Sequence, residues 1–123
     1  MSRVMAKILA VWFVAMSVHC NAATVSITPI SQIVDQGSSF SVELNVTGLI
    51  DGLAPSLGTF DIDVSFDSAV LAFSGITFGN QLDISGLGSI RSATPSVGML
   101  NIFELSLDAA ADLDALQAGA GGF

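Results

Sequence analysis

The sequence predicts an all-β fold: an antiparallel sandwich or barrel of short strands, with one short helix near the C-terminus. Segments in which apolar and polar residues alternate recur between glycine- and serine-rich turns, at the spacing of about 8–12 residues typical of such folds. Only one segment has the composition of a helix, whereas an α/β fold would need several. With 123 residues, the chain has room for one domain.

The N-terminus has the pattern of a secretory signal peptide. Arg3 and Lys7 flank the start of an apolar stretch, residues 8–16, and small residues follow before position 23. We expect cleavage after Ala22, with Ala23 as the alternative. The apolar stretch is well short of the roughly 20 residues that a membrane-spanning helix needs, so no stable span is expected once the leader is cleaved.

Residues 1–22 are thus the predicted leader and residues 23–123 the predicted domain. The leader takes with it the only Trp, the only His and the only Cys of the chain. The domain keeps one cation, Arg91, against 11 acidic residues, a side-chain charge of −10. This charge would repel a phosphate backbone, which argues against a nucleic-acid partner. Without His or Cys, the common nucleophile–base pairs are excluded, and we assign no catalytic, cofactor-binding or metal-binding residues.

The first two strands are expected at Thr24–Ile30 and Ser39–Leu49. The first carries a proline near its end, which is typical of an edge strand. The second alternates strictly between apolar and polar residues, the period of a half-buried strand. Its predicted inward side consists of Phe40, Val42, Leu44 and Val46.

The third and fourth strands are expected within and just after the stretch LGTFDIDVSFDSAVLAFSG, residues 57–75. Asp67 is expected to cap a tight turn through its side chain, and Leu71–Phe78 follows as a strand. In the third strand the predicted inward side consists of Phe60, Ile62, Val64 and Phe66, and the outward side carries Asp61, Asp63 and Ser65.

Two further strands and the helix complete the domain. A short strand is expected around Ser89–Ala93, and Met99–Leu107 is apolar on both faces, as in a strand that is covered on both sides. The Ala-rich segment Asp108–Ala118 predicts the helix, with Asp108 as its N-cap and Gly119 at its C-terminal end. Leu113 and Leu116 would seat this helix on the sandwich.

Glu104 is the one charge in the strand Met99–Leu107. We expect it to face solvent at a sheet edge, and the alternative is an ion pair with Arg91. The phenylalanines of the sandwich are expected mostly in its core: Phe40, Phe60, Phe66, Phe73, Phe78 and Phe103.

Three segments, in this order, resemble the cohesin-like domains of secreted bacterial proteins: GSSFSVELNVTGL, LGTFDIDVSFDSAVLAFSGITFG and LNIFELSLDAAADLDALQAG. The most specific part is the pattern G-x-F-D-x-D-V-x-F-D-x-x-V-L at residues 58–71. The chain is most similar to short Gram-negative proteins that carry a PEP-CTERM sorting signal. The resemblance implies an antiparallel jelly-roll sandwich of the cellulose-binding-module superfamily, located outside the cell or on its surface. It also implies a domain that is incomplete at its C-terminus, with an exposed sheet edge.

Asp61 and Asp63 are the candidate site residues. They lie two apart and so share one face of a strand. This face is either simply solvated, or a surface for a protein partner, or a weak calcium contact. Calcium prefers six to eight oxygen ligands from a loop that wraps the ion, which a straight strand does not offer. We therefore assign no metal site and carry Asp61 and Asp63 forward as a candidate partner-facing surface.

The predicted function is that of a non-catalytic recognition or structural domain. It would act by protein–protein contact at the cell surface or in an exopolysaccharide matrix, with a dockerin-like or other surface protein as its partner, as the resemblance implies. The alternative is a polysaccharide-binding module, which rests on fold analogy alone. No Trp or Tyr remains in the domain to build a flat aromatic strip for sugar rings.

Overall fold

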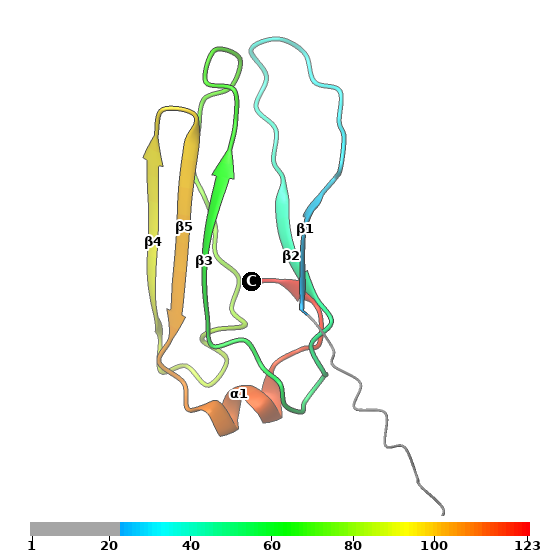
Figure 1. Ribbon diagram of the computed structural model, residues 1–123, viewed down its shortest axis with the longest axis vertical. Coiled ribbons are helices and arrows are strands. Elements are labelled where there is room, and N and C mark those ends of the chain that lie inside the picture. The colour runs from blue at the N-terminus through cyan, green and yellow to red at the C-terminus, as the bar shows by residue number, and fades with distance from the viewer. Residues whose placement is uncertain (1–22) are drawn as a thin grey trace, which may run out of the picture.

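The structure, a computed structural model, describes residues 23–123, so the predicted signal peptide lies outside the described residues. The described chain forms two antiparallel sheets and one short helix. In Figure 1, β3, β5 and β4 form one layer, β1 and β2 lie in the other, and α1 is at the lower end. The prediction of an all-β fold with a single helix is confirmed at this level.

The first sheet has the strand order β1-β2-β6. β1 (Thr24–Thr28) pairs along its whole length with β2 (Glu43–Thr47). β6 (Gly121–Gly122) is much shorter and lies opposite Asn45 and Val46 of β2. The rest of β2 therefore has no strand on its β6 side.

The second sheet has the order β3-β5-β4, with β5 in the centre. β3 (Thr59–Ser65) and β4 (Ser89–Ser96) both pair antiparallel with β5 (Met99–Ser106). The turn between β4 and β5 contains Gly98, whose φ of +72° favours glycine. The carbonyl of Gly98 also accepts a hydrogen bond from the backbone N–H of Phe66, which ties this turn to the end of β3. The strands expected around Ser89 and from Met99 are thus confirmed.

The core lies where the two sheets face each other and where α1 closes the lower end. Among the described residues its buried apolar side chains are few: Val46, Leu82, Leu100, Ile102 and Leu113. Many other inward-facing side chains remain partly exposed, including Val25 at 49% and Ile27 at 41%. The two sheets consequently enclose an open groove, described below.

One predicted strand does not form. Residues 71–78 run without any ladder partner, so the strand expected at Leu71–Phe78 is wrong for this structure. The strand expected at Ser39–Leu49 is reduced to its second half, because only Glu43–Thr47 lies opposite β1. Alternation shows which residues suit a strand, but a strand also needs a neighbour to take its backbone hydrogen bonds.

The helix is shorter than expected and begins differently. α1 spans Ala110–Leu116, and Ala109, not Asp108, is its N-cap, without a side-chain hydrogen bond. The helix gives way to extended backbone at Gln117 rather than continuing to Ala118. Leu113 is buried as predicted, whereas Leu116 is 55% exposed, so only one of the two leucines packs the helix against the sheets.

Asp108 holds a loop instead of capping the helix. Its carboxylate accepts hydrogen bonds from the Oγ of Ser85 and, at 3.1 Å, from the backbone N–H of Ser85. These bonds, that of the hydroxyl first, lower the pKa of Asp108 below its ordinary value of 3.8, and the opposing effect of burial is smaller. The bonds join the loop before β4 to the chain that follows β5.

This lowered pKa predicts how the stability of the domain depends on pH. A carboxyl group whose pKa falls on folding stabilises the fold at pH above 3.8, and that contribution is lost as the pH falls through the lowered folded value. We therefore expect the free energy of unfolding of the wild type to exceed that of Asp108→Asn at neutral pH, and this gap to close below pH 3.8. Urea titrations at a series of pH values measure the gap. A gap that stays constant through the acid range would contradict the assignment.

Gln117 joins three segments through one buried side chain. It is 1% exposed. Its Oε1 accepts a hydrogen bond of 2.6 Å from the backbone N–H of Leu57, and its Nε2 donates to the carbonyls of Leu57, at 2.8 Å, and Gln81, at 3.0 Å. The loop before β3, the loop after residue 79 and the end of α1 are therefore held together at one point.

Candidate functional site

The outward face of the second sheet carries both predicted site residues. Asp61 and Asp63 are exposed on β3, and their neighbours on β5 are Phe103 and Asn101, respectively. Phe60, Ile62 and Val64 point the other way, toward the first sheet. The prediction of which side of this strand is exposed to solvent and which side faces inward is thus confirmed.

Asn101 holds the two carboxylates in place. Its Nδ2 donates hydrogen bonds of 2.7 Å to Oδ1 of Asp61 and 2.9 Å to Oδ1 of Asp63. A calcium ion bound here would lie between the two carboxylates. The amide group of Asn101 occupies that position instead. Within residues 23–123, no three His, Cys, Asp or Glu side chains come together as a metal-binding group.

At one end of the same face, apolar side chains are exposed. The alternating sequence of β3 did not predict them, because they belong to β4 and β5. The register places Ile90 of β4 beside Leu105 of β5, and Ser92 beside Phe103. Ile90 is 51% and Leu105 is 37% exposed. Phe103 was expected in the core and instead lies in this outward row, next to Asp61. The face thus combines exposed apolar side chains with two fixed carboxylates.

Glu104 lies on the inward side of β5, not at a solvent-exposed edge, so the expectation of a solvated side chain is wrong. It is 0% exposed, because β5 is the central strand and Glu104 shares its inward side with Leu100 and Ile102. The alternative, an ion pair with Arg91, is the arrangement found: Nε of Arg91 lies 2.8 Å from Oε1 of Glu104. Oε1 also accepts a 2.6 Å hydrogen bond from the hydroxyl of Ser89.

Arg91 links this ion pair to the segment that follows residue 71. Its Nη2 donates to the carbonyl of Gly79 at 3.1 Å, and its guanidinium lies 5.6 Å from the centre of the Phe78 ring. Such a cation–π contact adds to the ion pair. The one cation of the described domain is therefore engaged within the fold.

A large groove of about 1100 Å³ opens between the two sheets. Its walls are the inward sides of β2 and β3 together with the segment 71–79, and Glu43 is the only charged residue among those that line it. Five of the six phenylalanines expected in the core line this groove: Phe40, Phe60, Phe66, Phe73 and Phe78. They face inward as predicted, but the space between them is open.

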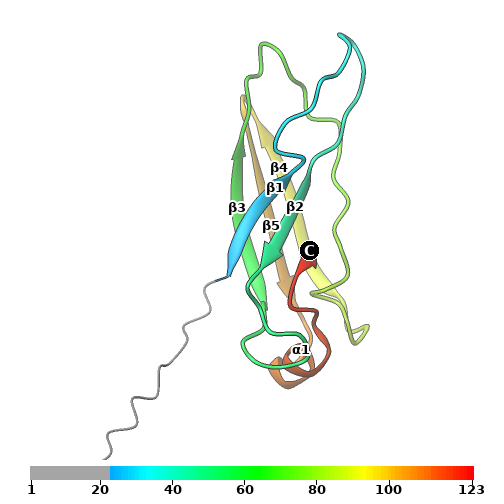
Figure 2. The same ribbon diagram turned by 90° about the vertical axis from the view of Figure 1, so that its right-hand side faces the viewer.

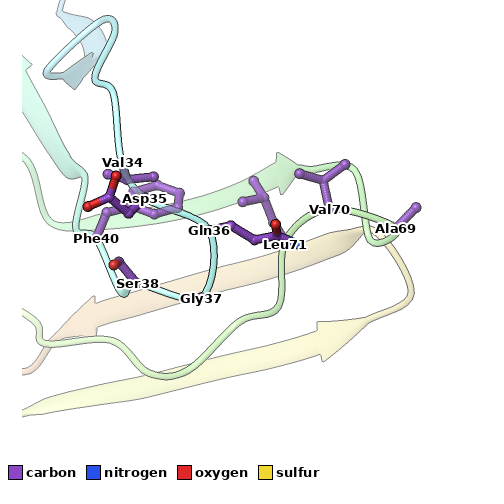
Figure 3. A pocket seen from close by; sticks show the side chains of 9 residues that line it. All are labelled: Val34, Asp35, Gln36, Gly37, Ser38, Phe40, Ala69, Val70 and Leu71. Atoms are coloured by element: carbon purple, nitrogen blue, oxygen red, sulfur yellow. The ribbon is translucent and has the colours of Figure 1, made fainter.

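A smaller hollow of about 450 Å³ lies at one end of the groove. It forms between the loop that precedes β2 and the turn that Asp67 begins, and Figure 3 shows Val34 and Phe40 on one side and Val70 and Leu71 on the other. Asp67 accepts a 2.9 Å hydrogen bond from the backbone N–H of Ala69, so its predicted role in a turn is confirmed. The hollow shares residues with the groove, including Phe40 and Leu71, and extends it.

Comparisons with known proteins add no relative: no protein-family model, no curated protein and no solved structure matches the chain.

No helix of residues 23–123 combines the length and the apolar character that crossing a membrane requires.

Proposed function

We propose that residues 23–123 form a non-catalytic recognition domain of a secreted protein. In this proposal the domain is a cohesin-like jelly-roll sandwich of the PEP-CTERM class, it works at the surface of a Gram-negative cell or in an exopolysaccharide matrix, and its partner is another protein. The observation that carries the proposal is the outward face of the β3-β5-β4 sheet. It presents apolar side chains beside carboxylates that are already ordered.

This face suits a protein partner for two reasons. Protein interfaces commonly join an apolar centre to a polar rim, and Ile90 and Leu105 lie on the same face as Asp61 and Asp63. In addition, Asn101 fixes both carboxylates before any partner arrives. Groups that are ordered in advance lose less conformational entropy on binding.

The test is capture of partners from the secretome of the source organism on the immobilised domain, followed by measurement of affinity for each captured protein. Neutralising the face with Asp61→Asn and Asp63→Asn keeps the side-chain shapes and removes two charges. We expect this double variant to weaken binding by on the order of tenfold, and to lower the salt dependence of the association rate.

A matched control removes two charges elsewhere. Asp51 and Asp112 are exposed and lie outside the sheet face, so Asp51→Asn with Asp112→Asn should leave the affinity within about twofold. Equal weakening by both double variants would mean that net charge, and not this face, governs binding. Failure to retain any protein, together with retardation of the domain on a polysaccharide gel, would overturn the proposal in favour of glycan binding.

A further inference from the structure

The outward face of the second sheet is ordered in four rows that cross its three strands. Each row aligns one residue of β3, one of β5 and one of β4. Neighbours within a row lie about 5 Å apart, and successive rows lie about 7 Å apart along the strands. From the α1 end upward, the rows are Thr59-Leu105-Ile90, Asp61-Phe103-Ser92, Asp63-Asn101-Thr94 and Ser65-Met99-Ser96.

This face is turned away from the groove between the sheets. In Figure 2, β1 and β2 lie in front of β3, β5 and β4, so the outward face of the second sheet points away from the viewer. The alternate residues of the same strands, Ile62 and Ile102 among them, line the groove on the near side, as does Phe123. The four rows therefore form a surface separate from the groove and from the pairing of β6 with β2.

All the charge on the four rows lies along β3. Its two carboxylates, here called the acidic margin, are those of Asp61 and Asp63. The cation Arg91 does not offset them on this face, because its side chain points inward to Glu104. The acidic margin consequently exerts a negative field that a basic group of a partner would neutralise.

β4 supplies a neutral margin on the opposite side of the face. The hydroxyl oxygens of Ser92 and Thr94 lie 3.4 Å apart, and the hydroxyl of Ser96 donates a hydrogen bond of 3.3 Å to the carbonyl of Met99. These three residues, here called the hydroxyl margin, carry no charge, and each hydroxyl has a partner within the sheet. The face is thus asymmetric in charge from β3 to β4.

The face is also asymmetric along its strands. In the row next to α1, Ile90 is 51% and Leu105 is 37% exposed, and Phe103 lies in the row above them. These three residues are here called the apolar end. In the row farthest from α1, Met99 is the one apolar residue and lies between two serines. Most of the apolar contact that the face can offer is therefore at one end.

We propose that a segment of a partner protein docks on this face in one orientation, with a basic side chain on the acidic margin and a large apolar side chain on the apolar end. This docking mode rests on the proposed recognition function, and it adds the chemistry of the partner's contact segment and the direction in which that segment lies. A second copy of the domain is a poor occupant. It would bring the same charge of −10, and its one cation is held by its own Glu104.

The reversed orientation is disfavoured by the cost of unpaired charge. If the segment were rotated by 180° in the plane of the sheet, its basic side chain would lie over the hydroxyl margin, and its apolar side chain would lie over the row of Met99. Asp61 and Asp63 would then be covered by a segment that offers them no cation. A carboxylate that loses water without gaining a charged partner is strongly unfavourable, and such unpaired groups select one binding mode against another.

The probe is a phage-displayed library of random twelve-residue peptides. It is selected on the immobilised domain and depleted on the double variant Asp61→Asn with Asp63→Asn. We expect the surviving peptides to combine Arg or Lys with a large apolar residue. A synthetic peptide of the selected sequence should lose about tenfold in affinity on the double variant, and it should change by no more than about twofold on the control Asp51→Asn with Asp112→Asn.

A second double variant tests the apolar end. Ile90→Ser with Leu105→Ser removes two exposed apolar side chains, so the fold should be kept, which thermal melting checks. We expect the selected peptide to lose about tenfold in affinity on this variant as well. Loss on both variants would show that the peptide contacts the acidic margin and the apolar end together.

Paramagnetic relaxation measures the orientation of the bound peptide. A nitroxide label is attached at the end nearer the basic residue or, in a second sample, at the end nearer the apolar residue. We expect the first label to broaden the amide resonances of β3 around Ile62. The second label should broaden those of β4 around Ile90.

Moving the charge across the sheet tests what sets this orientation. A fourfold variant keeps the net charge of the domain and places two carboxylates on the hydroxyl margin: Asp61→Asn, Asp63→Asn, Ser92→Asp and Thr94→Asp. We expect it to recover the affinity of the wild type for the peptide to within about threefold. The label at the basic end should then broaden β4 around Ala93 in place of β3.

Three results would overturn this docking mode. They are the absence of selected peptides that carry a basic residue and depend on the acidic margin, equal broadening of β3 and β4 by the label at the basic end, and binding to the fourfold variant without a change in the broadened residues. Secretome partners whose binding depends on the acidic margin, together with any of these results, would reject the single orientation and leave the proposed recognition function standing.

Discussion

Arg91→Met is expected to lower the free energy of unfolding by about 3 kcal/mol, the lower end of the range for breaking a buried ion pair. Glu104 is 0% exposed, and its Oε2 has no hydrogen-bond partner in the described part of the chain. Without Arg91, only the hydroxyl of Ser89 would remain to compensate the buried carboxylate. The lower end of the range applies because the Arg91 side chain is 37% exposed and its charge is partly screened.

A double-mutant cycle separates the charge from the packing. Glu104→Gln alone leaves a neutral group beside a cation that solvent can reach, so its cost should be about 1 kcal/mol. Arg91→Met combined with Glu104→Gln should be clearly more stable than Arg91→Met alone, because no buried charge is left unpaired. Urea unfolding at neutral pH measures all four proteins. Strictly additive losses would show that the two side chains stabilise the fold independently.

The alternation of apolar and polar residues predicted which side of a strand faces inward better than it predicted which strands pair with each other. In β3 the period of two separated Asp61 and Asp63 from the inward Ile62 correctly, because a strand reverses its side chains at every residue. It could not show that Leu71–Phe78 has no neighbour, because strand pairing depends on distant segments. Met99–Leu107 is apolar on both sides, so periodicity could not decide where Glu104 points. The packing of the first sheet against the side of β5 that carries Leu100 and Ile102 buries Glu104, and the register with β4 then places Arg91 beside it.

The candidate site was predicted in part for the same reason. Asp61 and Asp63 were found because their residue type and spacing are local features of one strand. Asn101 was missed, since it reaches them from 38 and 40 residues away and only the pairing of β5 with β3 brings it there. The apolar end of the face was missed because Ile90 lies in a segment that the sequence marked only as a short strand among glycines and serines. The local sequence shows which side chains one strand carries, whereas the sheet topology determines which side chains of different strands lie together on one surface.

Gln117→Ala is the other substitution expected to cost several kcal/mol. The side chain is buried, and its loss leaves the backbone N–H and C=O of Leu57 and the C=O of Gln81 without these partners. A buried polar group that loses its hydrogen bond costs about 1–3 kcal/mol, so we expect a loss of about 3 kcal/mol in the free energy of unfolding. Amide hydrogen exchange should report the loss locally, with faster exchange at Leu57.

Gln117→Glu tests the direction of these hydrogen bonds. It preserves the size of the side chain and the acceptor for the N–H of Leu57, but it replaces the amide donor with a carboxylate oxygen facing the carbonyls of Leu57 and Gln81. Gln81→Ala is the matched control, since it removes a half-buried glutamine whose Oε1 accepts one bond, from Ala118. We expect Gln117→Glu to be at least as destabilising as Gln117→Ala at neutral pH, and Gln81→Ala to cost about 1 kcal/mol. If all three variants unfolded at the same urea concentration as the wild type, the side chain of Gln117 would not hold these segments together.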